Sequence, residues 1–346
     1  MNRYRLFILL IILFLFQIGS LGMPDQFRTL VHGKSSIASV RFTTDGKRLV
    51  SASTNGTVVM WDVQTEKALW QMDLDKSGGN SDRTISHIQS MALSPDGNLI
   101  AVSYDRGKVI NSQLVEDDQY LIGLLDTKDG REKSVLSGHA KLIGALAFSP
   151  DGKLLASAGG DKMARMWNVE TRQQIGAIEL PRGASALAFS PSGKLLAVGL
   201  GVPMSGQEEN APNFLLSEVQ TGKIVRRFSP PGSRYVTDIA FSLDGNLLAI
   251  ASEVKPDITI WDTKSWANVQ TINDHTFNVG EIAFSSKERL FVSSDSLGQV
   301  FVRVAGIYAK PKSYKLHVEV KTISLSSDGT KLAAGTAEGK IILMRL

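Results

Sequence analysis

Residues 138–168 read GHAKLIGALAFSPDGKLLASAGGDKMARMWN. An apolar run ending at Phe148 leads into Ser149-Pro150-Asp151-Gly152, and a second short run, Leu154 to Ala158, follows. Asp-Gly between two apolar runs is a strong hairpin signal, because glycine adopts a positive φ without a Cβ clash. A third run ends at Trp167, and a polar turn separates it from a fourth run over residues 173–180. The stretch therefore predicts four consecutive antiparallel strands.

The pattern of residues 143–148 recurs along the chain. In each copy an aliphatic residue is followed by another three positions later and by Phe or Leu two positions after that. The copies are Ile37-Val40-Phe42, Ile88-Met91-Leu93, Ile143-Leu146-Phe148, Ala184-Leu187-Phe189, Val236-Ile239-Phe241, Val279-Ile282-Phe284 and Val320-Ile323-Leu325. Six of them continue into Asp-Gly or Ser-Gly, and the sixth in order has Lys287-Glu288 there. Four strands in about 42 residues, repeated seven times, predict an all-β fold over residues 23–346, a seven-bladed β-propeller of four-stranded antiparallel blades.

Residues 138–168 resemble the WD-repeat family of β-propellers. Blades of this family link a His, a Ser of the second strand, a turn Asp and a Trp of the third strand by hydrogen bonds. The matching residues here are His139, Ser157, Asp161 and Trp167. The resemblance implies that these four side chains form a structural hydrogen-bond set in the third blade.

The resemblance covers Phe27 to Leu346, but the set of four decays in other copies. The first copy keeps Ser51 and Trp61, with His32-Gly33 in reversed order and Asn55 at the Asp position. The sixth copy keeps Asp274-His275 and Ser293 but has Arg303 at the Trp position, and copies four and seven lack the Trp. We expect blades of uneven stability on the same apolar framework.

The two ends of the repeat region are complementary. The chain ends at Ile341–Leu346, the third strand of the seventh copy, and Gln26–Val31 is a strand candidate without a partner of its own. In the family that the sequence resembles, an N-terminal segment supplies the missing outer strand. We therefore expect the ring to be closed by an N-terminal strand, which removes a free sheet edge.

The N-terminal segment has the pattern of a secretory signal peptide. Arg3 and Arg5 precede an unbroken apolar run, Leu6 to Phe16, and small residues stand at Ser20 and Gly22. This predicts a signal peptide over residues 1–22 and a protein that is exported, periplasmic or extracellular, with a bacterial envelope favoured by the lack of Cys. The alternative is an uncleaved membrane anchor over residues 6–23, which would make the protein a membrane-anchored structural component of the envelope.

Composition argues against several classes of function. The 346 residues contain 38 Lys+Arg against 34 Asp+Glu and no Cys, a formal charge of +4 that is too small for a nucleic-acid footprint. The sequence has no nucleophile elbow, no phosphate-binding loop and no HExxH motif. Gly199-Leu200-Gly201 superficially resembles a dinucleotide loop but is interpreted as an ordinary loop. Five histidines, His32, His87, His139, His275 and His317, come from different blades without ligand spacing. We expect no catalytic residues, no metal and no cofactor.

Extra sequence marks one face of the ring. Relative to the shortest interval between copies, it falls at 75–83, 108–118 and 201–213. In an up-and-down blade with strands a to d from the centre outward, the d–a and b–c connections emerge on the same face. Insertions on one face often mark the binding face of a repeat protein. The residue just before each innermost strand lies at the mouth of the central channel on that face; the candidates for partner binding are Ser36, His87, Leu142, Tyr235, Asn278 and Glu319.

These observations favour a non-enzymatic scaffold that binds a protein or peptide partner and no nucleic acid. Membrane contact is expected only if the N-terminal segment remains uncleaved. The alternative from another class is a propeller that binds a small ligand, or acts as an enzyme, at the central channel. That alternative needs carboxylates or histidines converging at the channel mouth, and the six candidates do not provide such a set.

Overall fold

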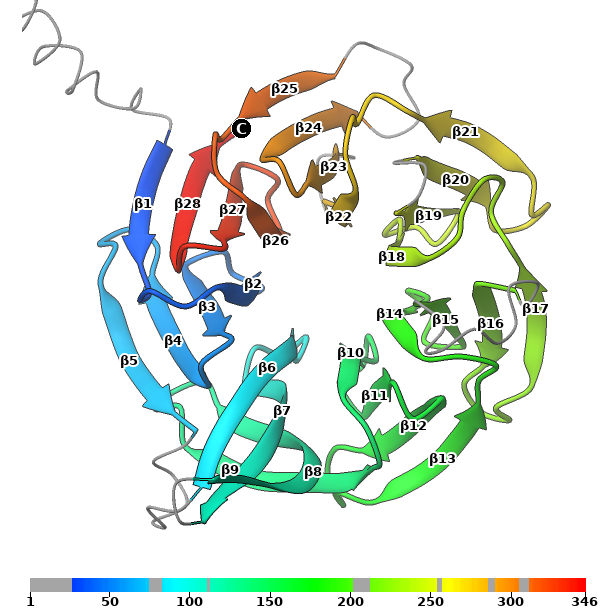
Figure 1. The fold of residues 1–346 in the computed structure, drawn as a ribbon. Helices are drawn as coiled ribbons and strands as arrows, with labels where there is room; N and C mark the ends of the chain where they lie inside the picture. Colours follow the sequence, from blue (N-terminus) through cyan, green and yellow to red (C-terminus); the bar gives the residue numbers. More distant parts are fainter. Residues whose placement is uncertain are drawn as a thin grey trace, which may run out of the picture.

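The computed structural model describes residues 27–74, 83–110, 113–201, 212–253, 257–285, 290–304 and 311–346. In this part of the chain, seven four-stranded antiparallel sheets surround a central axis like the blades of a propeller (Figure 1). The predicted all-β, seven-bladed architecture is confirmed. The predicted signal peptide or anchor lies outside the described residues. Within the ranges given above, no helix is long and apolar enough to cross a membrane.

Each blade runs from strand a at the axis to strand d at the periphery. Blade 1 contains β2 (Ile37–Phe42), β3 (Arg48–Ser53), β4 (Thr57–Asp62) and β5 (Ala68–Asp73). Blade 2 contains β6 (Arg83–Leu93), β7 (Leu99–Ile110), β8 (Gln113–Asp126) and β9 (Glu132–His139). Blade 3 contains β10 (Ile143–Phe148), β11 (Leu154–Gly159), β12 (Met163–Asn168) and β13 (Gln174–Glu179). Blade 4 contains β14 (Ala184–Phe189), β15 (Leu195–Leu200), β16 (Phe214–Glu218) and β17 (Ile224–Phe228).

The remaining blades follow the same order. Blade 5 contains β18 (Val236–Phe241), β19 (Leu247–Ser252), β20 (Ile258–Asp262) and β21 (Asn268–Ile272). Blade 6 contains β22 (Val279–Phe284), β23 (Leu290–Asp295), β24 (Gln299–Val304) and β25 (Lys312–Lys315). Blade 7 contains β26 (Val320–Leu325), β27 (Lys331–Thr336), β28 (Lys340–Arg345) and, as its outer strand, β1 (Phe27–Val31).

The N-terminal strand closes the ring, as predicted. β1 pairs antiparallel with β28 from Phe27 opposite Met344 to Val31 opposite Lys340. Leu30 is buried between blades 7 and 1, and the Phe27 ring packs edge-on against Tyr314 at 6.2 Å between centroids. The first and last strands of the described chain therefore share one sheet (Figure 1).

The Asp-Gly signals mark the a–b hairpins. Gly152 has a φ of 71°, and the glycines at the equivalent turns have φ values between 65° and 71°. Ser149 at the end of strand a donates a hydrogen bond of 2.6 Å to Asp151, whose carboxylate accepts the Lys153 amide. This side-chain bridge fixes the turn, and it explains why Ser and Asp recur together. The sixth turn, Lys287-Glu288, lies outside the described residues.

The core lies between the blades. One buried cluster joins Val50 and Met60 of blade 1 to Ile88 and Ile100 of blade 2, and the other clusters bridge neighbouring blades in the same manner.

The interpretation of Gly199 as part of a loop is wrong, because Gly199 lies inside β15. A Cβ on Gly199 would stand 2.5 Å from Val236 Cγ1, so the glycine lets blades 4 and 5 approach.

Two of the predicted insertions meet in blade 2. The 108–118 insertion prolongs β7 and β8, which pair as far as Ile110 opposite Gln113. β6 begins early and pairs with the prolonged β7, with Arg83 opposite Lys108. Blade 2 is therefore longer than its neighbours on the d–a/b–c face (Figure 1). Most of the first insertion (75–82) and of the third (202–211) lie outside the described residues.

Candidate partner-binding face

The six candidates lie around one mouth of the ring. A shared backbone hydrogen bond places five of them, because their carbonyl accepts an N–H from the b–c turn of the same blade. The pairs are Ser36 with Thr54, Leu142 with Gly160, Tyr235 with Glu253, Asn278 with Ser296 and Glu319 with Ala337. His87 is held differently: its N–H donates to the Asp105 carboxylate at 2.7 Å. The structure thus puts one candidate on each of six blades, spread around the ring and not gathered in one cluster.

The candidate side chains differ in how free they are. Leu142 is 43% exposed, and His87 is exposed. Tyr235 is half-buried with the Arg234 guanidinium 5.7 Å from its ring centre. Asn278 donates to Glu253 at 3.1 Å, and Glu319 forms an ion pair with Lys321. Leu142 is therefore an apolar candidate that stands free, while the Asn278 and Glu319 side chains are already engaged with neighbours.

Two exposed apolar residues on the same face were not among the candidates. Phe277 is 46% exposed in the connection before β22, and Leu297 is 49% exposed in the b–c turn of blade 6. The Ser296 amide donates to the Asn278 carbonyl, so the two connections touch. The sequence did contain a signal for Phe277: an apolar residue stands two positions before strand a, where the propeller framework does not require one.

The predicted structural set of blade 3 is assembled around one hydroxyl. Ser157 Oγ lies 2.7 Å from His139 Nε2 and accepts the Trp167 indole N–H at 2.8 Å. The other ring nitrogen, Nδ1, lies 3.0 Å from Asp161, which also pairs with Arg165. Burial lowers the pKa of His139, and the Asp161 carboxylate opposes this effect. The four side chains thus link the end of β9, the outer strand of blade 2, to β11, β12 and the turn between them in blade 3.

Blade 6 keeps this architecture with a different donor. Ser293 Oγ lies 2.8 Å from His275 Nε2, and Arg303 donates to the same oxygen at 2.9 Å in place of a tryptophan. Asp295, which sequence reasoning missed, lies 3.2 Å from His275 Nδ1. Arg303 also pairs with Asp274. In this blade a charged side chain replaces the indole and needs the carboxylate of Asp274 beside it.

Blade 1 also keeps the central hydroxyl. His32 Nδ1 and the Trp61 indole nitrogen lie 2.7 and 2.8 Å from Ser51 Oγ. Burial lowers the pKa of His32 to about 4. Three of the five histidines thus serve separate blades. In the described ranges, no three His, Cys, Asp or Glu side chains form a group suited to a metal ion.

The central channel holds three charged side chains that the sequence analysis did not single out. A cavity of about 390 Å³ at the axis is lined by Arg41, Asp238 and Glu281 among mostly small and apolar residues. Arg41 pairs with Glu281 at 3.1 Å. Asp238 accepts the amides of Ile239 and Ile282, both at 2.8 Å. Burial raises the pKa of Asp238 to about 7, and the Glu281 carboxylate adds to this.

These carboxylates connect blades. Asp238 of blade 5 holds an amide of blade 6, and Glu281 of blade 6 accepts the Thr322 hydroxyl and the Ile323 amide of blade 7. Arg41 then links blade 6 to blade 1. The charged side chains of the channel therefore form hydrogen bonds and an ion pair that connect blades 5, 6, 7 and 1.

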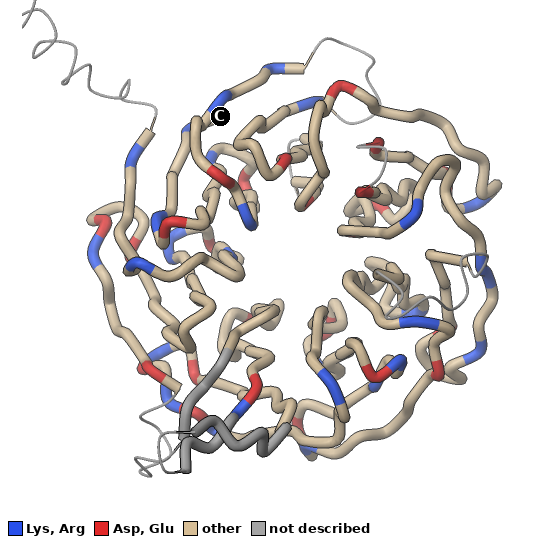
Figure 2. The backbone as a smooth tube through the Cα atoms, in the orientation of Figure 1, with Lys and Arg blue, Asp and Glu red and all other residues tan. Residues whose placement is uncertain are grey.

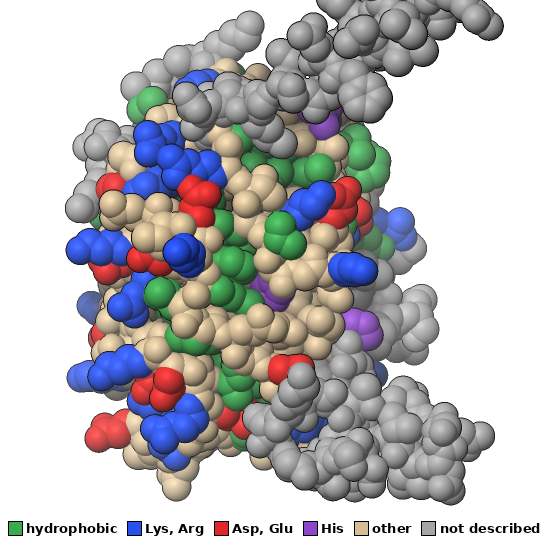
Figure 3. All heavy atoms as spheres, turned by 90° about the vertical axis from the view of Figure 1, so that its left-hand side faces the viewer, with side chains coloured by type: hydrophobic (Ala, Val, Ile, Leu, Met, Phe, Trp, Pro, Cys, Tyr) green, Lys and Arg blue, Asp and Glu red, His purple; other side chains and the backbone are tan. Residues whose placement is uncertain are grey.

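Charge elsewhere is mixed. Lys and Arg alternate with Asp and Glu around the ring (Figure 2), and the side formed by β1 and β5 shows both signs between small apolar areas (Figure 3). The side shown in Figure 3 thus offers no extended region of one sign that would suit a nucleic-acid backbone.

Comparisons with known proteins agree with this architecture. Residues 25–62 and 130–168 match the WD40 family profile, described as WD domain, G-beta repeat. Human WD repeat and SOCS box-containing protein 1 is 30% identical over 133 residues, 38% of this chain and 26% of that protein. Rat apoptotic protease-activating factor 1 is 22% identical over 277 residues, 78% of this chain and 19% of that protein. Fission yeast meiotic recombination protein rec14 is 30% identical over 131 residues, 38% of this chain and 36% of that protein.

The matched part spans about a quarter of the human relative and a third of the yeast one. The two profile matches fall on blades 1 and 3, which carry the Ser–Trp hydrogen bonds. Blades 2 and 4 to 7 share their four-strand order and their inter-blade packing. The chain is a seven-bladed β-propeller in which two segments, in blades 1 and 3, match the WD40 repeat.

Proposed function

We propose that this propeller is a non-enzymatic scaffold that binds a protein or peptide partner on its d–a/b–c face. WD40 propellers commonly bind proteins and are usually non-catalytic. The observation that carries the proposal is the asymmetry of this face: blade 2 is prolonged there, and blade 6 presents Phe277 and Leu297 on adjacent connections. Leu142 adds a third exposed apolar side chain on blade 3.

Exposed apolar side chains on rigid connections suit a binding surface. Phe277 and Leu297 are both nearly half exposed, and the strand framework beneath them is held by hydrogen bonds between blades. A partner that covers them removes apolar surface from water without reorganising the propeller. The polar candidates, Asn278 and Glu319, would form the rim of such an interface.

The channel alternative has less support. A catalytic or ligand-binding carboxylate needs a free oxygen directed at the ligand. Both oxygens of Asp238 accept backbone amides, and Glu281 is shared between Arg41, Thr322 and Ile323. These contacts favour a structural role for the channel charges.

The test uses a partner first identified by capture on the wild-type protein and then purified. Phe277→Ser combined with Leu297→Ser should weaken its affinity roughly thirtyfold, the effect expected when an interface hot spot is lost. The melting temperature should change little, because both side chains are exposed. The matched control is Lys47→Ala with Lys153→Ala in the a–b turns of the opposite face. If the lysine variant lost affinity and the apolar variant did not, the interface would lie on the a–b/c–d face, and the proposal would be wrong.

We further propose that the protein is exported. The support is the order of Arg3, Arg5 and the apolar run from Leu6 to Phe16. The intact mass of the protein in the exported fraction should correspond to a chain that begins near Met23. A full-length mass in the membrane fraction would support the anchor and contradict cleavage.

A further inference from the structure

One position of strand c decides how the space between neighbouring blades is filled. This position lies opposite a leucine of strand b. It is Trp61, opposite Leu49, in blade 1 and Trp167, opposite Leu155, in blade 3. In blade 4 the same position is Ser217, opposite Leu196. Blade 4 therefore lacks an indole that its neighbour has.

The surroundings of Trp167 show what that indole does. Trp167 packs in one buried cluster with Leu155 of its own blade and with Ile122, Leu124 and Leu136 of blade 2. It thus fills the space between blades 2 and 3.

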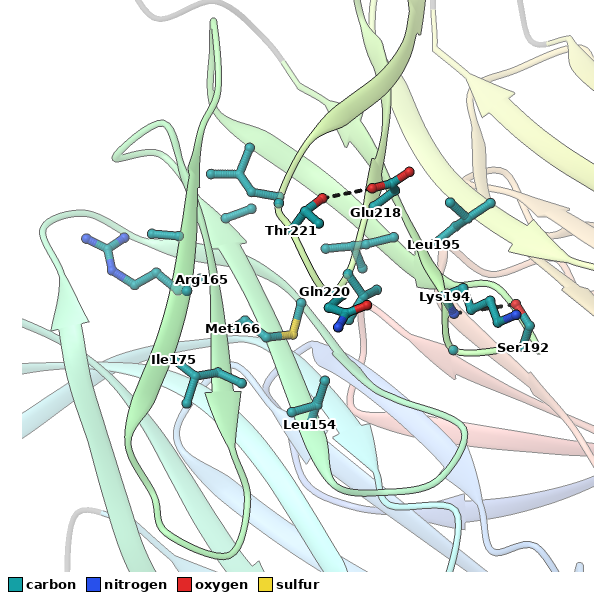
Figure 4. A pocket seen from close by; sticks show the side chains of 18 residues that line it. Leu154, Arg165, Met166, Ile175, Ser192, Lys194, Leu195, Glu218, Gln220 and Thr221 are labelled. Atoms are coloured by element: carbon teal, nitrogen blue, oxygen red, sulfur yellow. Dashed lines mark hydrogen bonds between the residues drawn. The ribbon is translucent and has the colours of Figure 1, made fainter.

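The equivalent surroundings between blades 3 and 4 are present without the indole. The strand registers align Ile122 and Leu136 of blade 2 with Ala164 and Ile178 of blade 3, which pair in the same way. Likewise, Leu124 corresponds to Met166, and Leu155 to Leu196. All four counterparts line a single open groove: Ala164, Met166, Ile178 and Leu196. Figure 4 shows this groove, with Met166 labelled.

The groove is larger than its counterparts between other blades. It has a volume of about 1000 Å³. The equivalent grooves beside Trp167 and Trp61 measure about 480 and 580 Å³. Blade 4, which carries Ser217 in place of a Trp, thus borders a wider groove with a mixed apolar and polar lining, which the Ser192–Gly193 and Gln220–Gly222 turns border. Ser217 itself is buried and does not line the groove.

We infer that this groove is a second binding site, which takes an aromatic side chain, tryptophan above all, from an extended peptide segment of a partner. The occupant follows from the chain itself, since an indole fills the corresponding site one blade earlier. β13, the outer strand of its sheet, forms one wall and leaves its outer edge unpaired in the sheet. Ile175 on that strand is 57% exposed and extends the apolar surface along it.

This site is separate from the proposed partner-binding face. The a–b and c–d turns that border it emerge on the opposite side of the ring from Phe277, Leu297 and Leu142. A partner could therefore occupy both sites at once, or two partners one each.

The probe for the test is N-acetyl-tryptophan amide, added to the full propeller labelled with ¹³C at the methionine methyl groups. Its binding should give a saturable shift of the Met166 methyl signal, with a dissociation constant of roughly 1 mM for one buried aromatic side chain. N-acetyl-alanine amide should give no saturable shift. If the Met166 signal responded equally to the two probes, or did not saturate with N-acetyl-tryptophan amide, the proposed binding site would be refuted.

Two variants close the groove in different ways. Ser217→Trp supplies the missing indole from the chain's own strand, and it should weaken probe binding at least tenfold while raising the melting temperature. Gly176→Phe covers the groove from β13, where a Cβ would meet only Met166 Cβ, at 3.8 Å, so folding is preserved. Ser217→Ala is the matched control and should bind as the wild type does. Unchanged binding in Gly176→Phe refutes the proposal even if Ser217→Trp fails to fold.

Discussion

Replacing Asp238 by asparagine should remove a component of stability that weakens as the pH rises. The half-buried carboxyl lines the channel, where it faces Glu281 and Arg41, and its pKa is raised from 3.8 to about 7. Between these two values the folded protein binds more protons than the unfolded chain. The free energy of unfolding therefore falls as the pH rises from about 4 to about 7, and it is constant above that range.

The size of the effect follows from the pKa difference. At about 1.4 kcal/mol per pKa unit, the interval corresponds to roughly 4 kcal/mol. Asparagine presents a donor N–H₂ where one backbone amide of Ile239 or Ile282 now donates, so the variant carries a cost, but this cost does not vary with pH. The difference in stability between wild type and variant isolates the Asp238 contribution from those of the buried histidines.

The assay is urea unfolding followed by tryptophan fluorescence at several values between pH 4.5 and 8. Relative to Asp238→Asn, the wild type should lose roughly 3 kcal/mol or more across this range. Asp328→Asn is the control: hydrogen bonds from Ser326 and Thr330 lower the pKa of Asp328 to about 2, so the carboxyl is ionised throughout and the difference should be flat. A flat or rising difference for Asp238→Asn would refute the reasoning.

Three further changes have defined outcomes. Ser157→Ala leaves the Trp167 indole N–H without its acceptor and His139 Nε2 without its hydroxyl partner, and it should cost about 2–4 kcal/mol in denaturant unfolding. A loss under about 1 kcal/mol would show that the set contributes little. Leu30→Ala should cost about 2–5 kcal/mol, since Leu30 is buried where β1 closes the ring; an unchanged melting temperature would contradict closure. Arg303→Ala should destabilise by about 2–3 kcal/mol, while Arg303→Trp, which can donate to Ser293, should recover most of it; equal loss in both would argue against the replacement.

The repeat pattern predicted the ring because nearly all blades use the same local signals. Ser or Thr follows strand a at Ser149 and its equivalents, and Asp-Gly or Ser-Gly follows at a fixed distance in six of the seven copies, so strand order and hairpins could be predicted. Closure by β1 also followed, since the last copy lacked an outer strand.

The channel charges escaped prediction for a physical reason. A bulge interrupts the pairing of strand a with strand b in every blade, for example between Val236 and Asp238. The two-residue alternation is interrupted there, so the pattern did not show that Asp238 and Glu281 lie toward the axis.

The other missed features depend on tertiary contacts. Arg303 reads as a lost Trp in the sequence, whereas in the structure it reaches the same serine. The groove at Ser217 required the comparison of two neighbouring blades in space, because a single serine in a strand carries no signal of a missing indole.

Closure by β1 also constrains the order of folding. Residues 27–31 leave the ribosome first among the described strands, and their partner strand, residues 340–345, leaves last. Contacts such as that between the Val40 amide and the Thr322 hydroxyl join residues 282 positions apart. Blade 7 therefore cannot be completed until residues 340–345 have been synthesised, and until then the growing chain exposes the unpaired face of its newest blade. Any truncation that removes residues 340–345 removes the strand with which β1 pairs.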